Sequence, residues 1–506
     1  MNRPARWTLT LLAVLSPALA LACSSPSTSD TPAGPGAPTA ESSAAAVCDK
    51  EPAGPNAAPA GAVTVDPAVA GDLVTKTRNS PAGTTFWLAP GVHRIGDQKY
   101  DQVEPKDGDV YLGAPGAVLD GKQLNQYAFT GHASDVKIQH LTVQGFDAPR
   151  DEGVVNHDSG DGWLIEHNTF QRNGGAALMA GARQQVRGNC LRDNGQYGMN
   201  AYKGDGTITG LVVEGNEITG NNTDDWETKE SGCGCTGGIK FWAVNGADVR
   251  GNWVHDNRGN ALWADTNNND FLIEGNVIEN NDGAAIEYEA SYNATIRNNT
   301  IRRNNWVDGR KYADRGDSFP VATIYISESG GEPRIPARTK TLDIEGNVLE
   351  DNWSGITLWE NADRFCNSPA NTSSGSCTLL VPGVDQCTQP GIETAPLLSD
   401  CRWKTQNVEI HDNRFTLDPT VLGCSVSCGR MGLLSNYGTY PDWSPYKGDV
   451  IQTAITEDQH NTWHDNTYVG PWTFVYGDTS QILDTFQWQG SPYLQDEGST
   501  FARGNG

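Results

Sequence analysis

The sequence predicts an all-β fold, a single-stranded right-handed parallel β-helix (solenoid) with an N-terminal capping helix and disulfide-bearing loop insertions. The first observation is a repeated frame, in which an apolar residue lies three positions before an Asn and another lies two positions after it, as in residues 213–218 and 273–278. The second is spacing, because successive Asn residues of this frame are 21, 27, 36, 24, 23 and 48 residues apart. A basic period of 21 to 24 residues with insertions is typical of one coil of such a solenoid.

The Asn of the frame is expected to be structural. A second Asn follows five residues later in all seven copies. Asn tolerates left-handed backbone angles at a bend, and its amide can bond to the amide of the next coil. The frame is present again at Asn413 and Asn466. Two Asn ladders are therefore predicted, the first with Asn168, Asn189, Asn216, Asn252, Asn276, Asn299 and Asn347, the second with Asn173, Asn194, Asn221, Asn257, Asn281, Asn304 and Asn352.

The first residues have the features of an export signal. Arg3 and Arg6 precede an apolar run over residues 7–22 that is too short for an ordinary membrane span. Residues 20–23, Ala-Leu-Ala-Cys, resemble a bacterial lipoprotein cleavage box, and this resemblance implies lipidation of Cys23. Ordinary signal-peptidase cleavage at the same small residues is the alternative. We therefore expect an extracytoplasmic protein, either lipid-anchored to the outer membrane or cell surface or secreted.

Composition divides the chain into three segments. Residues 1–22 are the signal peptide, and residues 23–62 are expected to be a lipid-anchored flexible linker of Ser, Thr, Pro, Ala and Gly. A segment with so few large apolar residues cannot offset the entropy cost of ordering. Residues 63–506 form the predicted β-helix domain, with insertions near residues 305–338, 361–404 and 416–460.

Both ends of the predicted solenoid have candidate caps. Asp66 and Pro67 are the residue types favoured at the N-cap and first position of a helix, which is expected to run to about Thr77. This helix would cover the first coil. Residues 470–472 and 487–493 contain Trp and Tyr beside Gly and Pro, and they are expected to cover the last coil.

The cysteine count favours disulfides. Lipidation of Cys23 would leave ten of the eleven Cys, an even number that suits an oxidising compartment. A zinc site at Cys233 and Cys235 is disfavoured because no second Cys/His pair follows at finger spacing. Local spacing indicates three pairs: Cys366 with Cys377, Cys387 with Cys401, and Cys424 with Cys428.

A strand follows each second Asn, and its outward side chains can be found by counting, because side chains alternate along a strand. The outward positions form one face that alternates aromatic residues with carboxylates. Exposed Trp and Tyr offer flat surfaces on which sugar rings stack, while the sugar hydroxyls reach polar neighbours. Packing of the aromatics beneath the insertion loops is the alternative. The expected substrate-binding residues are Tyr202, Lys240, Trp242, Trp263, Tyr325, Glu328, Trp359 and Glu360.

The net charge limits which classes of partner the protein is expected to bind. Lys plus Arg number 36 and Asp plus Glu number 62, so the net charge of −26 gives no attraction to nucleic-acid phosphates or anionic bilayers. We expect a monomer that binds a glycan, binds no nucleic acid and contacts a membrane only through the lipid anchor. No cofactor and no metal are expected for its chemistry.

Three carboxylates are the candidate catalytic residues. Asp265 and Glu289 each lie 13 residues after a ladder Asn, so the same count places them in one column on adjacent coils. Adjacent strands are ~4.8 Å apart, and two carboxyl groups ~5–5.5 Å apart suit a retaining glycosidase. Glu287 lies on the strand of Glu289 and, with either partner, could leave room for the water of an inverting reaction. Crowding of three acids is expected to raise at least one pKa.

The region from about Thr64 onward resembles right-handed parallel β-helix carbohydrate-active proteins of the pectate-lyase-like superfamily. More narrowly, Leu262-Trp-Ala-Asp265 and Glu289-Ala-Ser291 resemble strand motifs of β-helix glycoside hydrolases such as the bacterial β-xylosidase family. In that family an Asp is the nucleophile and a Glu one coil later is the acid/base. The resemblance implies these roles for Asp265 and Glu289.

Two other functions stay open. In a polysaccharide lyase or epimerase, Asp265, Glu287 and Glu289 would hold Ca²⁺ against a uronate carboxylate, and Lys240 would remove a proton. The net charge of −26 opposes a polyuronate substrate, and Lys240 could instead be a counter-ion of Asp265. A non-catalytic glycan-binding or adhesive protein would need only the repeat. His157, Asp158 and Lys203 lie at bends near the same face, where loop solvation explains them more simply.

Overall fold

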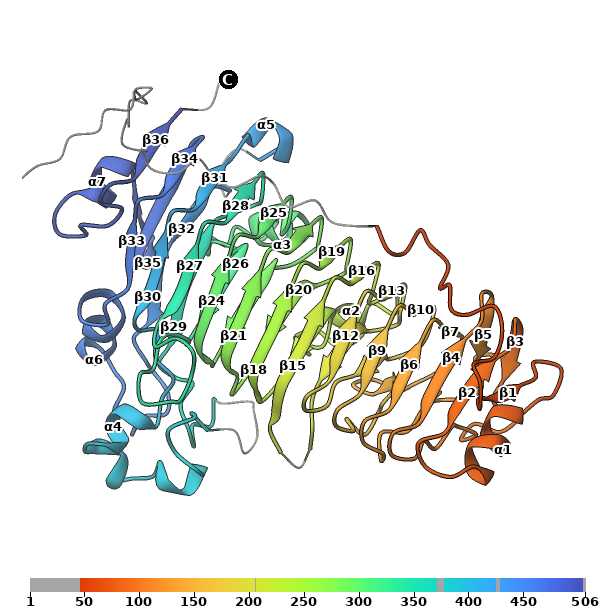
Figure 1. The fold of residues 1–506 in the computed structure, drawn as a ribbon. Coiled ribbons are helices and arrows are strands. Elements are labelled where there is room, and N and C mark those ends of the chain that lie inside the picture. Colours follow the sequence, from red (N-terminus) through yellow and green to blue (C-terminus); the bar gives the residue numbers. More distant parts are fainter. Residues whose placement is uncertain (1–45, 205, 371–376, 425–427, 504–506) are drawn as a thin grey trace, which may run out of the picture. The chain divides into compact units, whose positions relative to one another are not determined.

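The computed structural model describes residues 46–204, 206–370, 377–424 and 428–503, which form a parallel β-helix. Three sheets run along the solenoid, and each coil adds one strand to a sheet (Figure 1). Coil stacking satisfies the backbone N–H and C=O groups of each strand through its neighbours above and below. Because these contacts repeat, the fold class predicted from the sequence is confirmed.

The strands of the three sheets are short and are ordered as in the sequence. Sheet A consists of β1 (Val63–Val65), β2 (Thr85–Leu88), β4 (Val110–Gly113), β6 (Lys137–Gln139), β9 (Leu164–Glu166), β12 (Gln185–Arg187), β15 (Ile208–Glu214), β18 (Val244–Arg250), β21 (Asn269–Glu274), β24 (Tyr292–Arg297), β27 (Leu342–Glu345), β30 (Val408–His411) and β33 (Thr462–His464). Sheet B consists of β3 (Gly91–Arg94), β5 (Ala117–Asp120), β7 (Thr142–Gln144), β10 (Thr169–Gln171), β13 (Cys190–Arg192), β16 (Glu217–Thr219), β19 (Trp253–His255), β22 (Val277–Glu279), β25 (Thr300–Arg302), β28 (Val348–Glu350), β31 (Arg414–Thr416), β34 (Thr467–Val469) and β36 (Thr500–Ala502). Sheet C consists of β8 (Gly153–Val155), β11 (Ala176–Met179), β14 (Tyr197–Ala201), β17 (Gly237–Phe241), β20 (Asn260–Ala264), β23 (Ile286–Glu289), β26 (Ile324–Ser327), β29 (Ile356–Asn361), β32 (Arg430–Asn436) and β35 (Thr473–Leu483).

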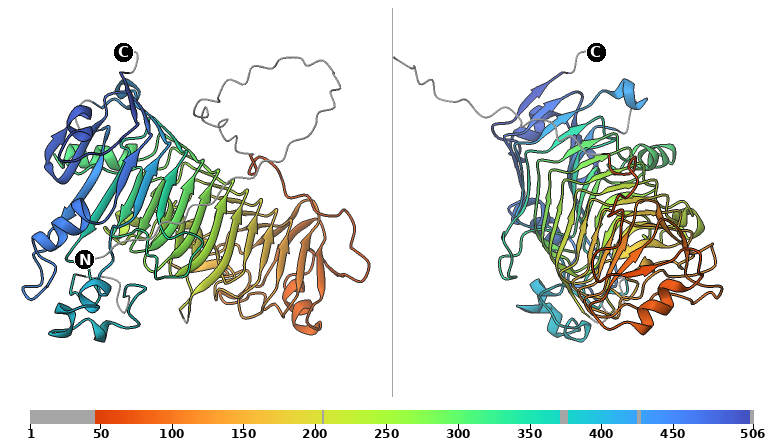
Figure 2. Two further views of the ribbon diagram at one scale, coloured as in Figure 1. Left: turned by 60° about the vertical axis from the view of Figure 1, so that its left-hand side comes forward. Right: turned by 45° about the vertical axis from the view of Figure 1, so that its right-hand side comes forward.

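The helices are short and lie at the ends of the solenoid or in loops between strands. They are α1 (Asp72–Asn79), α2 (Trp226–Lys229), α3 (Trp306–Asp314), α4 (Leu397–Asp400), α5 (Pro419–Leu422), α6 (Asp449–Gln452) and α7 (Thr485–Gln489), with short 3₁₀ or π turns at Val384–Gln386, Gly391–Glu393 and Thr453–Glu457. Figure 2 shows the loop region that contains α4 projecting from the stacked strands. No helix in the described ranges is long and apolar enough to cross a membrane.

The two Asn ladders are present and buried. Asn252 donates its backbone N–H and its side-chain amide to Asn276 Oδ1 at 3.0 and 2.9 Å, and Asn276 donates in the same way to Asn299. The first ladder continues to Asn413 and Asn466, as predicted. The left-handed angle, however, falls on the residue before each ladder Asn, for example on His167 (φ 57°) before Asn168. The Asn is therefore selected for its hydrogen bonds and not for its own backbone angle.

The helix at the first coil begins later than predicted. Asp66 accepts a hydrogen bond from the Ala68 N–H at 2.9 Å, so it stabilises a turn, and α1 begins only at Asp72. Gly71 precedes the helix with a left-handed φ of 73°. Leu73 of α1 packs into the hydrophobic core, so the helix covers the end of the solenoid as expected. At the other end, the buried Trp488 of α7 stacks on Phe474 with ring centroids 4.7 Å apart.

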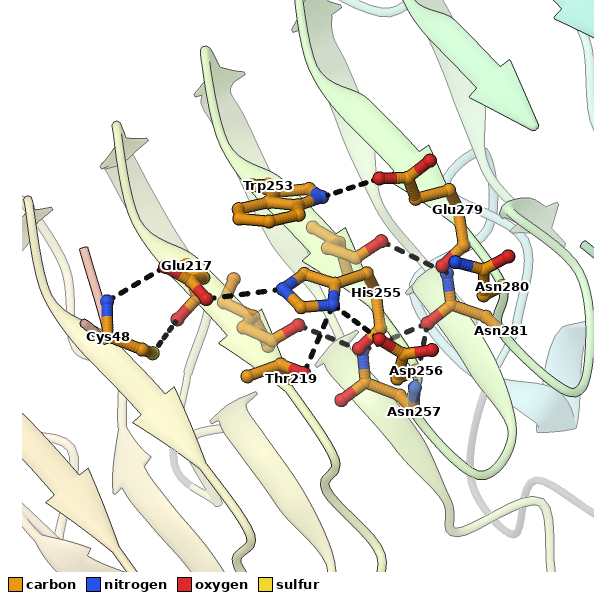
Figure 3. A network of polar contacts seen from close by, with 12 residues as sticks. Cys48, Glu217, Thr219, Trp253, His255, Asp256, Asn257, Glu279, Asn280 and Asn281 are labelled. Carbon is orange, nitrogen blue, oxygen red and sulfur yellow. Dashed lines mark hydrogen bonds and ion pairs between the residues drawn. The ribbon is translucent and has the colours of Figure 1, made fainter. Parts of the chain in front are cut away.

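The segment before the solenoid is bound to sheet B, which differs from the flexible linker expected through residue 62. Cys48 forms a disulfide with Cys190. The backbone N–H groups of Val47 and Cys48 donate to Glu217 Oε2 at 2.6 and 2.8 Å. Figure 3 shows Cys48 beside Glu217. His255 contacts the other oxygen of Glu217 at 3.3 Å, and although burial opposes its charged form, hydrogen bonds to Glu217 and Asp256 raise its pKa. Because the two Cys are 142 residues apart, no local sequence pattern indicated this disulfide.

Five disulfides occur within the described ranges, and they include the three pairs predicted from local spacing. Cys233 and Cys235 form a disulfide with each other, which removes both as zinc ligands. Disulfides of this number are typical of proteins in oxidising compartments outside the cytoplasm. The predicted signal peptide and Cys23 lie outside the described residues.

Candidate functional site

Sheet C carries two columns of outward side chains, and strand register places them. In the first column Lys240 pairs with Trp263, Trp263 with Glu287, and Glu287 with Tyr325. In the second column Asp265 follows β20 and donates its N–H to Phe241 O at 2.9 Å, which continues the register beyond the strand. Asp265 therefore occupies the position beside Glu289 on the adjacent coil, as the counting argument predicted. The inward positions of these strands are buried in the core.

Asp265 is held by a cation and by its own turn. Lys240 Nζ lies 2.9 Å from Asp265 Oδ2, and Thr266 donates its N–H and hydroxyl to Asp265 Oδ1 at 2.6 and 2.9 Å. The Lys240 ammonium also donates to Gly234 O at 2.5 Å and lies 4.1 Å above the Trp263 ring. Lys240 is therefore in the position of a counter-ion to Asp265.

Glu289 is an acceptor on both oxygens. Trp263 Nε1 donates to Glu289 Oε2 at 3.0 Å, and Arg364 Nη1 donates to Glu289 Oε1 at 2.5 Å. The same Arg364 nitrogen lies 3.0 Å from Glu328 Oε2. A carboxylate that accepts from two N–H donors, one of them cationic, is stabilised in its ionised form.

Glu287 accepts a hydrogen bond from an uncharged amide. The Asn260 side-chain amide donates to Glu287 Oε2, while Asn260 Oδ1 accepts the Ala284 N–H at 2.8 Å, which fixes the orientation of the amide. Burial, together with the charges of Glu289 and Asp265, raises the pKa of Glu287 well above its usual range, against the effect of Lys240 and Arg364. The raised pKa favours the protonated form of Glu287.

Glu328 is the fourth acid near this cluster. Its side chain is buried, accepts the Asn361 N–H at 3.0 Å and the Ser327 hydroxyl at 2.9 Å, and contacts Arg364. Burial raises the pKa of Glu328 to about 7, although Arg364 opposes this shift. Glu328 supports Arg364 from behind and does not extend into a cavity.

At the C-terminal coils, loops cover part of the aromatic face expected from the sequence. Phe319, from the loop before β26, packs edge-on against Tyr325 and Trp359, with ring centroids 6.1 and 5.5 Å away. Glu360 is buried, accepts from Arg402 and receives the Thr405 N–H at 3.0 Å, so its carboxylate is occupied by the protein itself. The insertion loops cover these side chains, which counting along strands could not reveal.

The N-terminal coils of the same face remain open. Tyr202 follows β14 and is 45% exposed, and Trp242, one coil on, is half-buried. Tyr202 and Lys203 line a cavity of about 840 Å³ that lies over the loops beside β8, β11 and β14. Of the expected binding residues, Tyr202 lines this cavity.

Arg364 and Asn260 contact the carboxylates but were not predicted. Arg364 lies in the insertion after β29, 75 residues from Glu289 in sequence, and only the excess of acids on the face could have indicated a cation there. Asn260 is the first residue of β20, and alternation along the strand would group it with the inward Leu262, so counting could not have indicated its contact with Glu287.

A metal has no clear donor set at these carboxylates. The charges of Asp265 and Glu289 are matched by Lys240 and Arg364, so a calcium ion would have to displace both cations. Within the described ranges, two groups of side chains have metal-ligand spacing: Cys233 and Cys235 with Glu227, and Asp343, Glu345 and His411 on sheet A. The first is a disulfide, and the second lies on another sheet.

Comparison with known proteins agrees with the observed architecture. Residues 152–335 match a family model described as a right-handed β-helix region. The fold is a right-handed parallel β-helix. No curated protein matches the sequence. Among solved structures, XylC in complex with xylose is 10% identical, with 87% of this chain and 86% of that chain covered and a TM-score of 0.49.

Two further solved structures are similar at this level. The catalytic unit of a thermostable GH87 α-1,3-glucanase from Streptomyces thermodiastaticus is 13% identical, with coverage of 89% and 69% and a TM-score of 0.45. The A-module of the mannuronan C-5 epimerase AlgE6 from Azotobacter vinelandii is 13% identical, with coverage of 90% and 98% and a TM-score of 0.43. These proteins have different activities, so the functional argument rests on the side chains of this chain.

Proposed function

We propose that the chain is an exported glycoside hydrolase that cleaves O-glycosidic bonds of a polysaccharide or oligosaccharide at Asp265, Glu287 and Glu289. The observation that carries this proposal is a cluster of carboxyl groups on adjacent coils, in which Asp265 contacts Lys240, Glu289 shares Arg364 with Glu328, and Glu287 contacts an uncharged amide. The raised pKa of Glu287 favours its protonated form in this cluster. Glycoside hydrolysis requires a pair of acid and anion.

The environments of the three groups support distinct roles. Glu287, with its raised pKa, is the proton donor to the leaving oxygen. Asp265, paired with Lys240, is the ionised partner that attacks the anomeric carbon or activates a water. Glu289 accepts from Trp263 and Arg364 and keeps a negative charge beside Glu287, which raises the pKa of the donor. This assignment moves the acid role from Glu289, where the sequence placed it, to Glu287.

The assignment has a stereochemical consequence. Asp265 and Glu289 are neighbours across one strand spacing of ~4.8 Å, which suits the retaining reaction expected from the sequence. Glu287 and Asp265 are instead diagonal neighbours, separated by one strand spacing and by two residues along the strand, roughly 8 Å in all. A separation of ~6.5–9.5 Å leaves room for a water and suits inversion. With Glu287 as proton donor, we expect products of inverted configuration.

The Ca²⁺-dependent lyase or epimerase is the weaker alternative. Lys240 would have to remove a proton, but its ammonium is held by Asp265 Oδ2 and by Gly234 O and offers no lone pair in this arrangement. Non-catalytic glycan binding remains an outcome of the test below. For the location, we propose export through residues 1–22 and anchoring to the envelope through a lipid on Cys23.

The test is a product analysis on a panel of purified polysaccharides. Wild-type protein is expected to release new reducing ends, and separate Asp265→Asn and Glu287→Gln variants are expected to lose this release while they keep the fold. Products with ultraviolet-absorbing unsaturated ends that disappear with a chelator would identify a lyase. Retention of a glycan without any product would identify a binding protein.

A further inference from the structure

A cavity near sheet C is separate from the carboxylates. It has a volume of about 840 Å³, and Tyr127, His157, Asp158, Met179, Tyr202 and Lys203 are among its lining residues. Its walls come from the loops after β8 and β14 and from the end of β11. His157, Asp158 and Lys203, which loop solvation was expected to explain, thus converge on one cavity.

The polar groups of the cavity are fixed by contacts inside the protein. Tyr127 stacks on His157 with ring centroids 4.0 Å apart, and its hydroxyl donates to Glu152. Asp158 Oδ2 accepts the Gly131 N–H at 3.1 Å. Burial lowers the pKa of His157, although Asp158 opposes this shift, so its ring is neutral at pH 7 and can donate one hydrogen bond and accept another. The cavity therefore offers preorganised donors and acceptors.

The charge of the cavity selects the class of ligand. Asp151, Glu152, Asp158 and Asp161 are among its lining residues, and the Lys203 ammonium is occupied by Asp161 Oδ1 at 3.2 Å. An anionic ligand such as a uronate would be repelled by these carboxylates. A neutral sugar ring can donate hydroxyl groups to the carboxylates while its C–H face stacks on an aromatic ring. The exposed ring of Tyr202 is available for such stacking.

An outward column connects the cavity to the carboxylates. Trp242 donates its N–H to Ala201 O at 2.9 Å, and Asp265 donates to Phe241 O at 2.9 Å, so Tyr202, Trp242 and Asp265 occupy equivalent positions on successive coils. Two coils correspond to ~10 Å along the solenoid. A glycan that spans from Asp265 to the cavity would lie over Trp242, which occupies the coil between them.

We propose that this cavity binds a neutral sugar unit of the same glycan whose bond is cleaved near Asp265, about two coils away. The inference rests on the proposed function, and it adds that the substrate is a neutral glycan long enough to reach both places. Binding energy from the remote sugar unit then contributes to cleavage, so short substrates are processed poorly.

The experiment compares neutral and acidic oligosaccharides of increasing length. The probes are xylo-oligosaccharides, gluco-oligosaccharides and galacturonic acid oligomers, with binding measured by titration calorimetry on the Glu287→Gln variant and kcat/KM measured on proteins with Glu287 intact. We expect affinity and kcat/KM to rise with length for one neutral series and to be flat or absent for the acidic one. The Tyr202→Ala and Asp158→Asn variants should each lose about tenfold or more for long probes and little for the shortest.

Tyr440→Ala is the matched control, because this Tyr is 51% exposed and lies in another loop region. It should leave the length dependence unchanged. Equal length dependence in wild type, Tyr202→Ala and Asp158→Asn would overturn the inference, and tighter binding of the acidic series would overturn the ligand class. Length-dependent binding that both variants weaken, without cleavage of any probe, would support the cavity as a sugar site and refute the proposed hydrolase.

Discussion

Sheets B and C carry the same Trp–Glu–Arg cluster in different surroundings. In each cluster an indole N–H donates to a Glu on the adjacent coil at 3.0 Å, and an Arg donates to the other oxygen of that Glu. The residues are Trp253, Glu279 and Arg303 on sheet B, and Trp263, Glu289 and Arg364 on sheet C. Figure 3 shows the Trp253–Glu279 pair. Since the cluster occurs twice, it is not by itself evidence for catalysis.

The neighbours of the two Glu residues make the difference. Glu279 pairs in register with His255 on one side and Arg302 on the other, so sheet B surrounds its carboxylate with basic residues. Glu289 has Asp265 on the adjacent coil and Glu287 on its own strand. Crowding of acids costs folding free energy, and perturbed carboxyl groups cluster at functional sites. This contrast is the reason that we propose the reaction for the carboxylates of sheet C and a structural role for the cluster of sheet B.

The largest effect should come from removing the proton donor. Glu287→Gln is expected to lower kcat/KM on a natural glycan by about 10²–10⁴-fold, the range for loss of a general acid. Glu279→Gln, on sheet B, keeps a hydrogen-bond acceptor for Trp253 and should change the rate little. Initial rates of reducing-end release measure both. Equal losses in the two variants would remove the distinction between the sheets.

Substitution of a ladder Asn should lower the free energy of unfolding and should not act on the reaction itself. Asn276→Ala leaves the N–H and the side-chain amide of Asn252 without their acceptor, so unfolding free energy should fall by about 3 kcal/mol or more. The exposed Asn245 accepts one hydrogen bond, from Asn269, so Asn245→Ala should cost well under half as much. Denaturant titration or calorimetry measures the two. If Asn276→Ala lowers the unfolding free energy as little as Asn245→Ala does, the ladder does not hold the coils together.

Glu328 on the acid-rich face should contribute a pH effect on stability. The pKa of Glu328 is raised from 4.5 to about 7, so between these values the folded chain binds a proton that the unfolded chain lacks. The contribution of Glu328 to stability therefore falls as pH rises through this window. The decrease in Tm from pH 4.5 to 7 should be a few degrees smaller in Glu328→Gln than in wild type. Glu279→Gln controls for the loss of a carboxylate. If Tm changes with pH in Glu328→Gln as it does in wild type, the raised pKa of Glu328 would be refuted.

The smallest expected effect is that of metal removal. Because Lys240 and Arg364 already match the charges of Asp265 and Glu289, treatment with EDTA should leave the hydrolysis rate unchanged. Added calcium should not increase it. Loss of activity with EDTA and its return with calcium would favour the lyase alternative.

The sequence predicted what repeats and missed what does not. The Asn period gave the coils, and the equal offsets of Asp265 and Glu289 from their ladder Asn gave their proximity, because one hydrogen-bond register is kept from coil to coil. Arg364 and Phe319 belong to insertions without a repeat, so their positions over sheet C depend on loop packing. This is why Tyr325 and Trp359 were expected to be exposed and are instead half-buried against Phe319.

Local signals were reliable only over short distances. Cys pairs separated by 11, 14 and 4 residues were predicted, whereas Cys48 and Cys190, 142 residues apart, were not. The Asp66–Pro67 signal did produce an ordered turn, but the helix begins after Gly71. Loop closure over long separations leaves no pattern in the sequence, since the partners meet only when the coils are stacked.

The most direct test of Glu287 as proton donor uses the leaving group of the substrate. A dinitrophenyl glycoside of the sugar that the wild type cleaves has a leaving group that departs without protonation, whereas a natural oligosaccharide requires it. The measurement is the ratio of kcat/KM between wild type and Glu287→Gln for each substrate. We expect a loss within about tenfold for the dinitrophenyl glycoside and about 10²–10⁴-fold for the oligosaccharide. The same large loss for both substrates would contradict the role of Glu287.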